Sequence, residues 1–221
     1  MKERKRRAKN MMGRREKHHS CLLLFLCFIL LMAGCGHRNP PERPDNICEI
    51  FRERRSWYKK ADASSRRWDI PIPVIMAIMH QESAYQARVK PPRTTFLWVF
   101  PGPRPSSAHG YAQATDSTWD WYRQSTGNSR AKRRNFGDAI DFIGWYCRLS
   151  KTKCGIDPND AYGMYLAYHE GQGGYNRQTY RKKTWLLSVA RKVQSRSRSY
   201  EQQLSSCEEE FRRRSFRLWP F

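Results

Sequence analysis

The amino-acid sequence predicts an all-α protein, and three observations lead to this prediction. Apolar residues recur at helical spacing, as in the segment Val74 to Met79, rather than in strict alternation. Residues typical of helix starts precede such segments: Pro71 and Pro73 stand at this one, and Asn135 stands before a later one. Strand signals are scarce and no internal repeat is apparent. We therefore expect one mainly helical domain.

The N-terminal segment predicts export. Residues 1–20 carry nine Lys or Arg and two Glu, and an apolar run from Cys21 to Ala33 follows them. This run is too short to span a bilayer, which takes about 20 residues, but it fits the apolar part of a signal peptide. Its end, Leu31 to Cys35, resembles a bacterial lipobox, and an ordinary secretory signal cut nearby is the alternative. Met11 or Met12 is an alternative start of the chain.

These features divide the chain into three parts. Residues 1–34 are expected to be a lipoprotein signal peptide, removed before Cys35, whose thiol and new amine would be lipidated. Residues 35–45, which include three prolines, are interpreted as a tether between the lipid and the domain. Residues 46–221 form a single domain of about 175 residues, long enough for a sizeable core.

Six helices are expected in this domain. Asp116 is interpreted as a cap of the third, Asn135 as a cap of the fourth, and Asp157-Pro158 as the start of the fifth. The expected helices are Ile47–Arg66, Pro73–Glu82, Ser117–Ser125, Phe136–Leu149, Pro158–His169 and Lys183–Phe211.

The second expected helix ends in an ionisable side chain. Its inward stripe, which ends at Ile78 and Met79, is followed three residues later by Glu82, which therefore lies close to the same face. Desolvation at that place raises the pKa of a carboxyl group toward neutrality, as a proton donor requires. The alternative is a solvated Glu at a helix end.

Three short segments, in order, carry a family resemblance. They are Glu82-Ser83, then Gly110-Tyr111-Ala112-Gln113, then Ala167-Tyr168-His169-Glu170-Gly171. Together they resemble the lytic transglycosylases of the soluble, goose-lysozyme-like kind, whose pattern is Glu-Ser, Gly-Leu-Met-Gln and Ala-Tyr-Asn-Ala-Gly. The resemblance covers roughly Ile70 to Val193 and implies a lysozyme-like helical fold. The chain departs from the pattern at Tyr111-Ala112 and at His169-Glu170.

The resemblance also implies roles for these residues. Glu82 would be the catalytic acid, Gln113 would hydrogen-bond the sugar, and Tyr168 would position Glu82 or the substrate. Ser83, Tyr111 and His169 are the further substrate-binding candidates, and His169 can take over the hydrogen bonds of the family's Asn because imidazole both donates and accepts.

The implied reaction is cleavage of peptidoglycan between N-acetylmuramic acid and N-acetylglucosamine. The N-acetyl group of the substrate attacks the sugar, and Glu82 acts first as acid and then as base, so that a 1,6-anhydro ring closes without water. If Asp116 or Glu170 served as a second carboxylate, the enzyme would be a hydrolysing lysozyme instead. A catalytically silent glycan-binding envelope protein of the same fold is the remaining alternative. No cofactor is implied.

A proline-rich segment, Lys90 to Arg104, lies between the acid and the Gln motif. A short hairpin or lid over the cleft is one interpretation, with Trp98 or Phe100 stacked on sugar faces. Packing of the same aromatic residues in the core is the other.

The chain is strongly basic, with a formal charge of +22, of which about +15 remains once residues 1–20 are removed. Such a surface favours nucleic acid, anionic membranes or acidic polymers. In an exported protein we expect peptidoglycan and envelope phosphates rather than nucleic acid. The predicted location is the periplasmic face of the outer membrane, where the lipid on Cys35 holds a monomer on the membrane.

Four cysteines follow the lipobox, and an even number in an oxidising compartment suggests two disulfides. Of the three connectivities we favour Cys48 with Cys207, which would tie the terminal helices, and Cys147 with Cys154, which would close a short loop. No metal site is expected, since the spacing of His80, His109 and His169 matches no common zinc motif.

Overall fold

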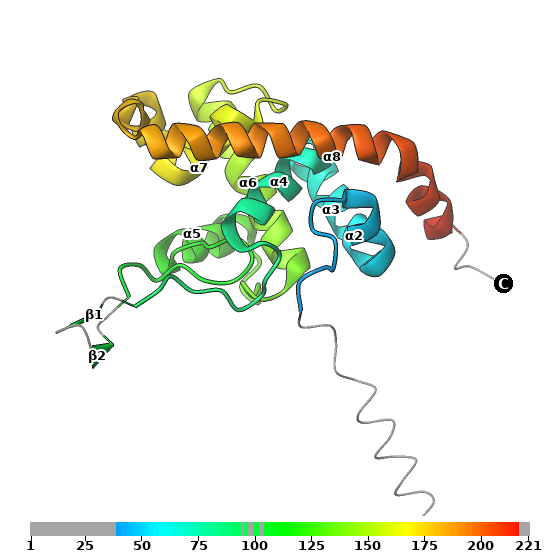
Figure 1. Cartoon of the computed structure of the whole chain (residues 1–221), viewed down its shortest axis with the longest axis horizontal. Coiled ribbons are helices and arrows are strands. Elements are labelled where there is room, and N and C mark those ends of the chain that lie inside the picture. The colour runs from blue at the N-terminus through cyan, green and yellow to red at the C-terminus, as the bar shows by residue number, and fades with distance from the viewer. Residues whose placement is uncertain (1–38, 94, 97–99, 102–103, 217–221) are drawn as a thin grey trace, which may run out of the picture. The chain divides into compact units, whose positions relative to one another are not determined.

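The computed structural model describes residues 39–93, 95–96, 100–101 and 104–216 (Figure 1). The predictions for the signal peptide, Cys35 and Trp98 lie outside these residues. The helices are α2 Ile47–Glu53, α3 Arg55–Trp68, α4 Ile72–Ser83, α5 Asp116–Thr126, α6 Phe136–Cys154, α7 Ala161–Asn176, the short 3-10 helix η1 Thr179–Lys182, and α8 Thr184–Phe216. The expected mainly helical class is confirmed.

A small hairpin interrupts the helices where the proline-rich segment predicted one. Strand β1, Thr95–Phe96, pairs antiparallel with β2, Phe100–Pro101. The expectation of a hairpin between the acid and the Gln motif is therefore confirmed, whereas its role as a lid stays a prediction.

Helix α4 is the buried centre of the domain. Every residue from Ile72 to Met79 is buried, and α4 packs against α3, α6, α7 and α8. A helix that is apolar on all sides is stable only when it is enclosed in this way. Its last residue is Ser83, and Ala84 ends it in the left-handed conformation. The chain therefore presents Glu82 in the final turn of its most buried helix.

Helix α8 is 33 residues long and packs against α2, α4 and α7 (Figure 1). A disulfide between Cys48 in α2 and Cys207 in α8 joins two segments that are 159 residues apart, as expected from the sequence. Within the ranges given above, the structure contains no helix that is both long enough and apolar enough to cross a bilayer.

The second expected disulfide is wrong. Cys147 is a buried free thiol and Cys154 a partly buried one, and both belong to α6. Seven residues of α-helix separate their Cα atoms by about 10 Å, beyond the roughly 7 Å that a disulfide spans. The prediction failed because α6 continues past Leu149, where the sequence suggested that the helix gives way to a loop.

Several expected boundaries also differ. The first expected helix is broken at Arg54 into α2 and α3. Helix α5 is capped by Thr115, whose hydroxyl accepts from the Thr118 amide, so the capping role expected of Asp116 is wrong. Helix α7 begins at Ala161, with Asp160 as its cap, rather than at Pro158. Asn135 caps α6 as predicted.

Candidate active site

The three motifs that stand far apart in the sequence meet at one cavity. Its volume is about 340 Å³, and its wall comes from α4, the loop before α5, and helices α5, α6 and α7. The lining residues are Glu82, Ser106, Ala108, Gln113, Ala114, Thr115, Thr118, Phe142, Tyr146, Tyr168, His169, Glu170 and Gly171. Of the residues singled out from the sequence, Glu82, Gln113, Tyr168 and His169 are thus brought together.

Glu82 is partly buried and lines this cavity. Desolvation by the surrounding core raises the pKa of its carboxyl group from 4.5 to about 7, and a hydrogen bond from the Tyr165 hydroxyl opposes part of that rise. Both effects follow from geometry: burial disfavours the charged form, and a donor favours it. The side chain is therefore not the solvated Glu of the alternative interpretation, and near neutral pH it exists in both protonation states.

Tyr165 is a site residue that the sequence analysis missed. It is buried on α7 and bonds to Glu82, whereas Tyr168 donates its hydroxyl to the Ala112 carbonyl at 2.5 Å. Tyr168 therefore holds the loop that carries the Gln motif, while Tyr165 holds the carboxyl group. The available signal was the spacing, because residues three apart share a helix face and Tyr165 precedes Tyr168 by three.

Gln113 has a strained and well-defined position. Its φ is 47°, and its side-chain amide nitrogen donates to the carbonyls of Gly110, at 2.7 Å, and Val89, at 3.1 Å. Only the nitrogen of an amide can donate to two carbonyls, so the orientation of the group is determined. No hydrogen bond to the amide oxygen comes from the residues that the structure describes, so this oxygen can accept from a ligand in the cavity that Gln113 lines.

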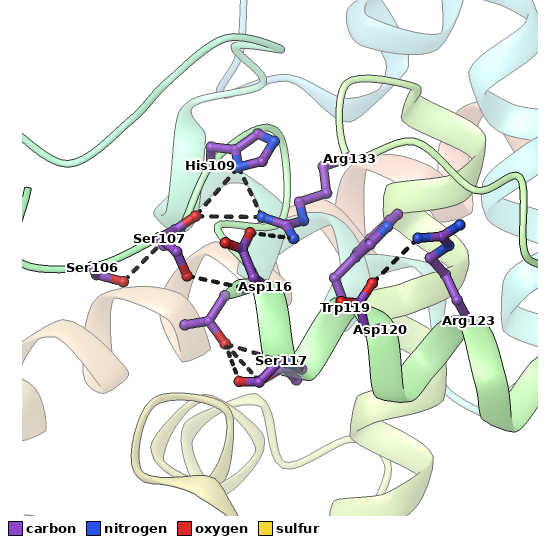
Figure 2. A network of polar contacts seen from close by, with 12 residues as sticks. Ser106, Ser107, His109, Asp116, Ser117, Trp119, Asp120, Arg123 and Arg133 are labelled. Carbon is purple, nitrogen blue, oxygen red and sulfur yellow. Dashed lines mark hydrogen bonds and ion pairs between the residues drawn. The ribbon is translucent and has the colours of Figure 1, made fainter.

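A buried arginine organises the same loop. Arg133 donates to Asp116 at 2.7 Å, to the Ser107 carbonyl at 3.3 Å and to Nδ1 of His109 at 2.8 Å (Figure 2). The Ser107 hydroxyl in turn accepts from the Asp116 amide at 3.0 Å. This network joins the start of α5 to the segment before Gly110, and it therefore supports the wall of the cavity on that side.

Position 110 requires glycine because the backbone carbonyl of Arg133 lies very close to it. The φ of Gly110 is +79°, and a Cβ atom there would lie 2.4 Å from the carbonyl oxygen of Arg133. The amide of the next residue, Tyr111, donates to that oxygen at 3.2 Å. Only glycine combines this backbone conformation with this close approach.

Two predicted substrate contacts are wrong. Ser83 is buried and donates its hydroxyl to the Met79 carbonyl at 3.2 Å, so it does not line the cavity. Tyr111 is buried against the rings of Trp57 and Phe136, with centroids 5.8 and 6.0 Å away. The physical reason is direction: the side chains of Ser83 and Tyr111 are buried in the core and not in the cavity wall that Glu82 and Gln113 line.

Glu170 lines the cavity but is fully engaged. One carboxylate oxygen accepts from Lys183 at 2.6 Å and contacts Nδ1 of His169 at 3.0 Å, and the other accepts from the Thr179 hydroxyl. Although burial acts in the opposite direction, the hydrogen bonds from Lys183, Thr179 and His169 together lower the pKa of Glu170 to about 2. In the described part of the cavity wall, the pKa of Glu82 is thus raised and that of Glu170 lowered.

A break in helix α7 at Gly171 lies between Glu170 and Lys183, which are in contact. The φ of 72° and ψ of 159° at Gly171 interrupt α7, a combination that is essentially restricted to glycine. The interruption follows directly after His169 and Glu170, and η1 then leads into α8. As a result, Lys183 approaches Glu170 from the start of the next long helix.

A family model described as "Transglycosylase SLT domain" matches residues 23–207, which is most of the chain. A search of curated proteins gave no match. The matched region contains all three motifs and every described residue that lines the cavity.

Proposed function

The chain belongs to the family of transglycosylase SLT domains, and on this basis we propose that it cleaves the β-1,4 bond between N-acetylmuramic acid and N-acetylglucosamine. The family acts on peptidoglycan. The finer proposal, a 1,6-anhydromuramyl product formed with Glu82 as acid and then base, rests on one observation. Glu82 lines the cavity beside Gln113 and Tyr168, and its pKa is raised to about 7.

In the first step the protonated Glu82 gives its proton to the glycosidic oxygen. The bond from that oxygen to C1 of the muramyl sugar breaks as the acetamido oxygen of the same sugar bonds to C1. The leaving chain departs as an alcohol and Glu82 becomes a carboxylate. The Tyr165 hydroxyl stabilises this charge because it donates a hydrogen bond to it.

In the second step the carboxylate of Glu82 removes the proton of the C6 hydroxyl. The C6 oxygen bonds to C1, the bond from C1 to the acetamido oxygen breaks, and the anhydro ring is closed. Glu82 is protonated again and no water is consumed. A pKa near 7 suits a group that must both give and take a proton at neutral pH. Gln113 would hold the sugar in position, and Tyr168 would hold the loop that carries Gln113.

The state of the other carboxylates supports this route over hydrolysis. A lysozyme needs a second carboxylate to act as nucleophile or to activate water. In the described part of the cavity wall that group is Glu170, which Lys183, His169 and Thr179 already engage. Asp116 is paired with Arg133 and does not line the cavity.

The test is the mass of the products released from purified sacculi. The wild-type chain should release muropeptides with anhydro ends, and Glu82→Gln should release none while still binding sacculi. Products that carry a hydrated reducing end would establish a lysozyme instead. Equal binding by both proteins with no product from either would establish a catalytically silent glycan-binding protein.

The cellular location is a separate proposal. The basic leader, the apolar run and the lipobox ending at Cys35 support an exported lipoprotein, and we propose that it acts as a monomer at the periplasmic face of the outer membrane. Metabolic labelling with a fatty acid should mark the wild-type chain and not Cys35→Ala. A label that persists in the variant would contradict the anchor.

A further inference from the structure

The indole ring of Trp185 is exposed beside a residue of the cavity wall, His169. Trp185 is 55% exposed and Trp121 is 39% exposed, and in the part of the chain that the structure describes these are the large hydrophobic residues at the surface. Single exposed apolar residues are common, so exposure alone indicates nothing. What distinguishes Trp185 is its position relative to the cavity.

Trp185 lies at the rim of the Glu82 cavity. Its ring makes a T-shaped contact with the His169 ring, with centroids 5.2 Å apart and planes at 79°, and His169 lines the cavity. The ring is thus one residue removed from the cavity wall, on the side formed by α7 and the start of α8.

The backbone that carries Trp185 is fixed to that wall. Lys183, two residues earlier, donates to Glu170 at 2.6 Å, and Thr179 in η1 donates to the same carboxylate. Glu170 also contacts His169 at 3.0 Å. A network that binds both His169 and the start of α8 limits the movement of the exposed ring relative to the cavity.

Trp121 provides a contrast. Its ring contacts Trp145 with centroids 4.8 Å apart, and the Lys153 ammonium lies 5.3 Å from its centroid. One face of this ring is therefore occupied by a cation. Within the described residues, Trp185 has one aromatic contact, with His169, no cation over its ring and no hydrogen bond from its indole nitrogen.

We propose that Trp185 forms a glycan-binding subsite adjacent to the cleavage site, on the side of α7 and α8. One face of a β-linked N-acetylhexosamine carries mainly C–H groups, and stacking removes that apolar area and the ring from water. The free indole N–H can donate to a hydroxyl or acetamido oxygen of the same sugar. The inference rests on the proposed function, because it assigns a second sugar position to the same substrate.

The experiment measures binding separately from cleavage. In the full-length chain carrying Glu82→Gln, the affinity for N-acetylglucosamine tetramer and for purified sacculi is measured with and without Trp185→Ala. The expected result is a loss of about tenfold in affinity for the tetramer. Trp185→Phe should retain most of the affinity, and Trp121→Ala, the matched exposed tryptophan, should change it little. Melting temperatures check that each variant is folded.

The outcomes separate the two proposals. If the otherwise wild-type Trp185→Ala chain cleaves sacculi with unchanged KM and binds the tetramer as well as its parent does, the subsite is refuted. If the substitution instead weakens binding to vesicles of anionic phospholipid and leaves glycan binding intact, the ring is a membrane contact and the inference is refuted. If glycan binding depends on Trp185 while the wild-type chain releases no product, the subsite stands and the proposed reaction falls.

Discussion

Replacement of Glu82 by Gln should stabilise the folded protein at alkaline pH. The two side chains have nearly the same shape, and the Tyr165 hydroxyl can donate to the amide oxygen as it does to the carboxyl group. The substitution therefore removes the charge and little else. Catalysis would be lost and stability gained at the same position, which is the pattern expected where a site keeps a charge in an unfavourable environment.

The magnitude follows from the pKa. Folding raises the pKa of Glu82 from 4.5 to about 7, so the folded state binds the proton more tightly than the unfolded state. Below about pH 4.5 both states are protonated and the two proteins should be equally stable. As pH rises through the window from 4.5 to 7 the wild type loses stability by 1.36 kcal/mol per pH unit, about 3 kcal/mol in all.

The assay is urea unfolding of both proteins at pH 4 and at pH 8.5. The variant should match the wild type at pH 4 and exceed it by about 3 kcal/mol at pH 8.5. Glu170→Gln is the matched control of opposite sign: because the folded pKa of Glu170 is about 2, its charge stabilises above pH 4.5, and this variant should be less stable at neutral pH. A Glu82→Gln variant with the same stability difference at both pH values would refute the reasoning.

Three further predictions concern other residues. Tyr165→Phe removes the donor that stabilises ionised Glu82, so the alkaline fall of kcat/KM should move up by about one pH unit; an unchanged profile would disprove the contact. Gly110→Ala should cost at least about 2 kcal/mol in urea unfolding because its Cβ would meet a carbonyl at 2.4 Å, whereas Gly127→Ala, where φ is +70° and space is open, should cost about 1; equal losses would contradict the steric argument. Cys207→Ser should lower the free energy of unfolding by about 2 to 5 kcal/mol, and a fully stable variant would show that the bridge to α2 is dispensable.

The sequence by itself determined the helical class, the order of the elements and the segments that form the site. The apolar run from Val74 to Met79 located α4, although the helix is buried on all sides there and not along one inward stripe. Glu82 could be proposed as the acid because it lies in the last turn of that helix, close to its apolar residues. Gln113 and Tyr168 could be placed at the same site only through motifs whose order resembles a known family. The pairing of Cys48 with Cys207 was one of three open connectivities.

Only the tertiary structure decided which atoms face which. Local pattern does not record that Ser83 turns back to its own helix, or that Tyr165 rather than Tyr168 bonds to Glu82. It also does not show that Lys183 forms an ion pair with Glu170. The physical reason is that periodicity fixes the face of a residue on its own helix. The direction of a side chain, its desolvation and its partner depend on helices that pack against it from distant parts of the chain.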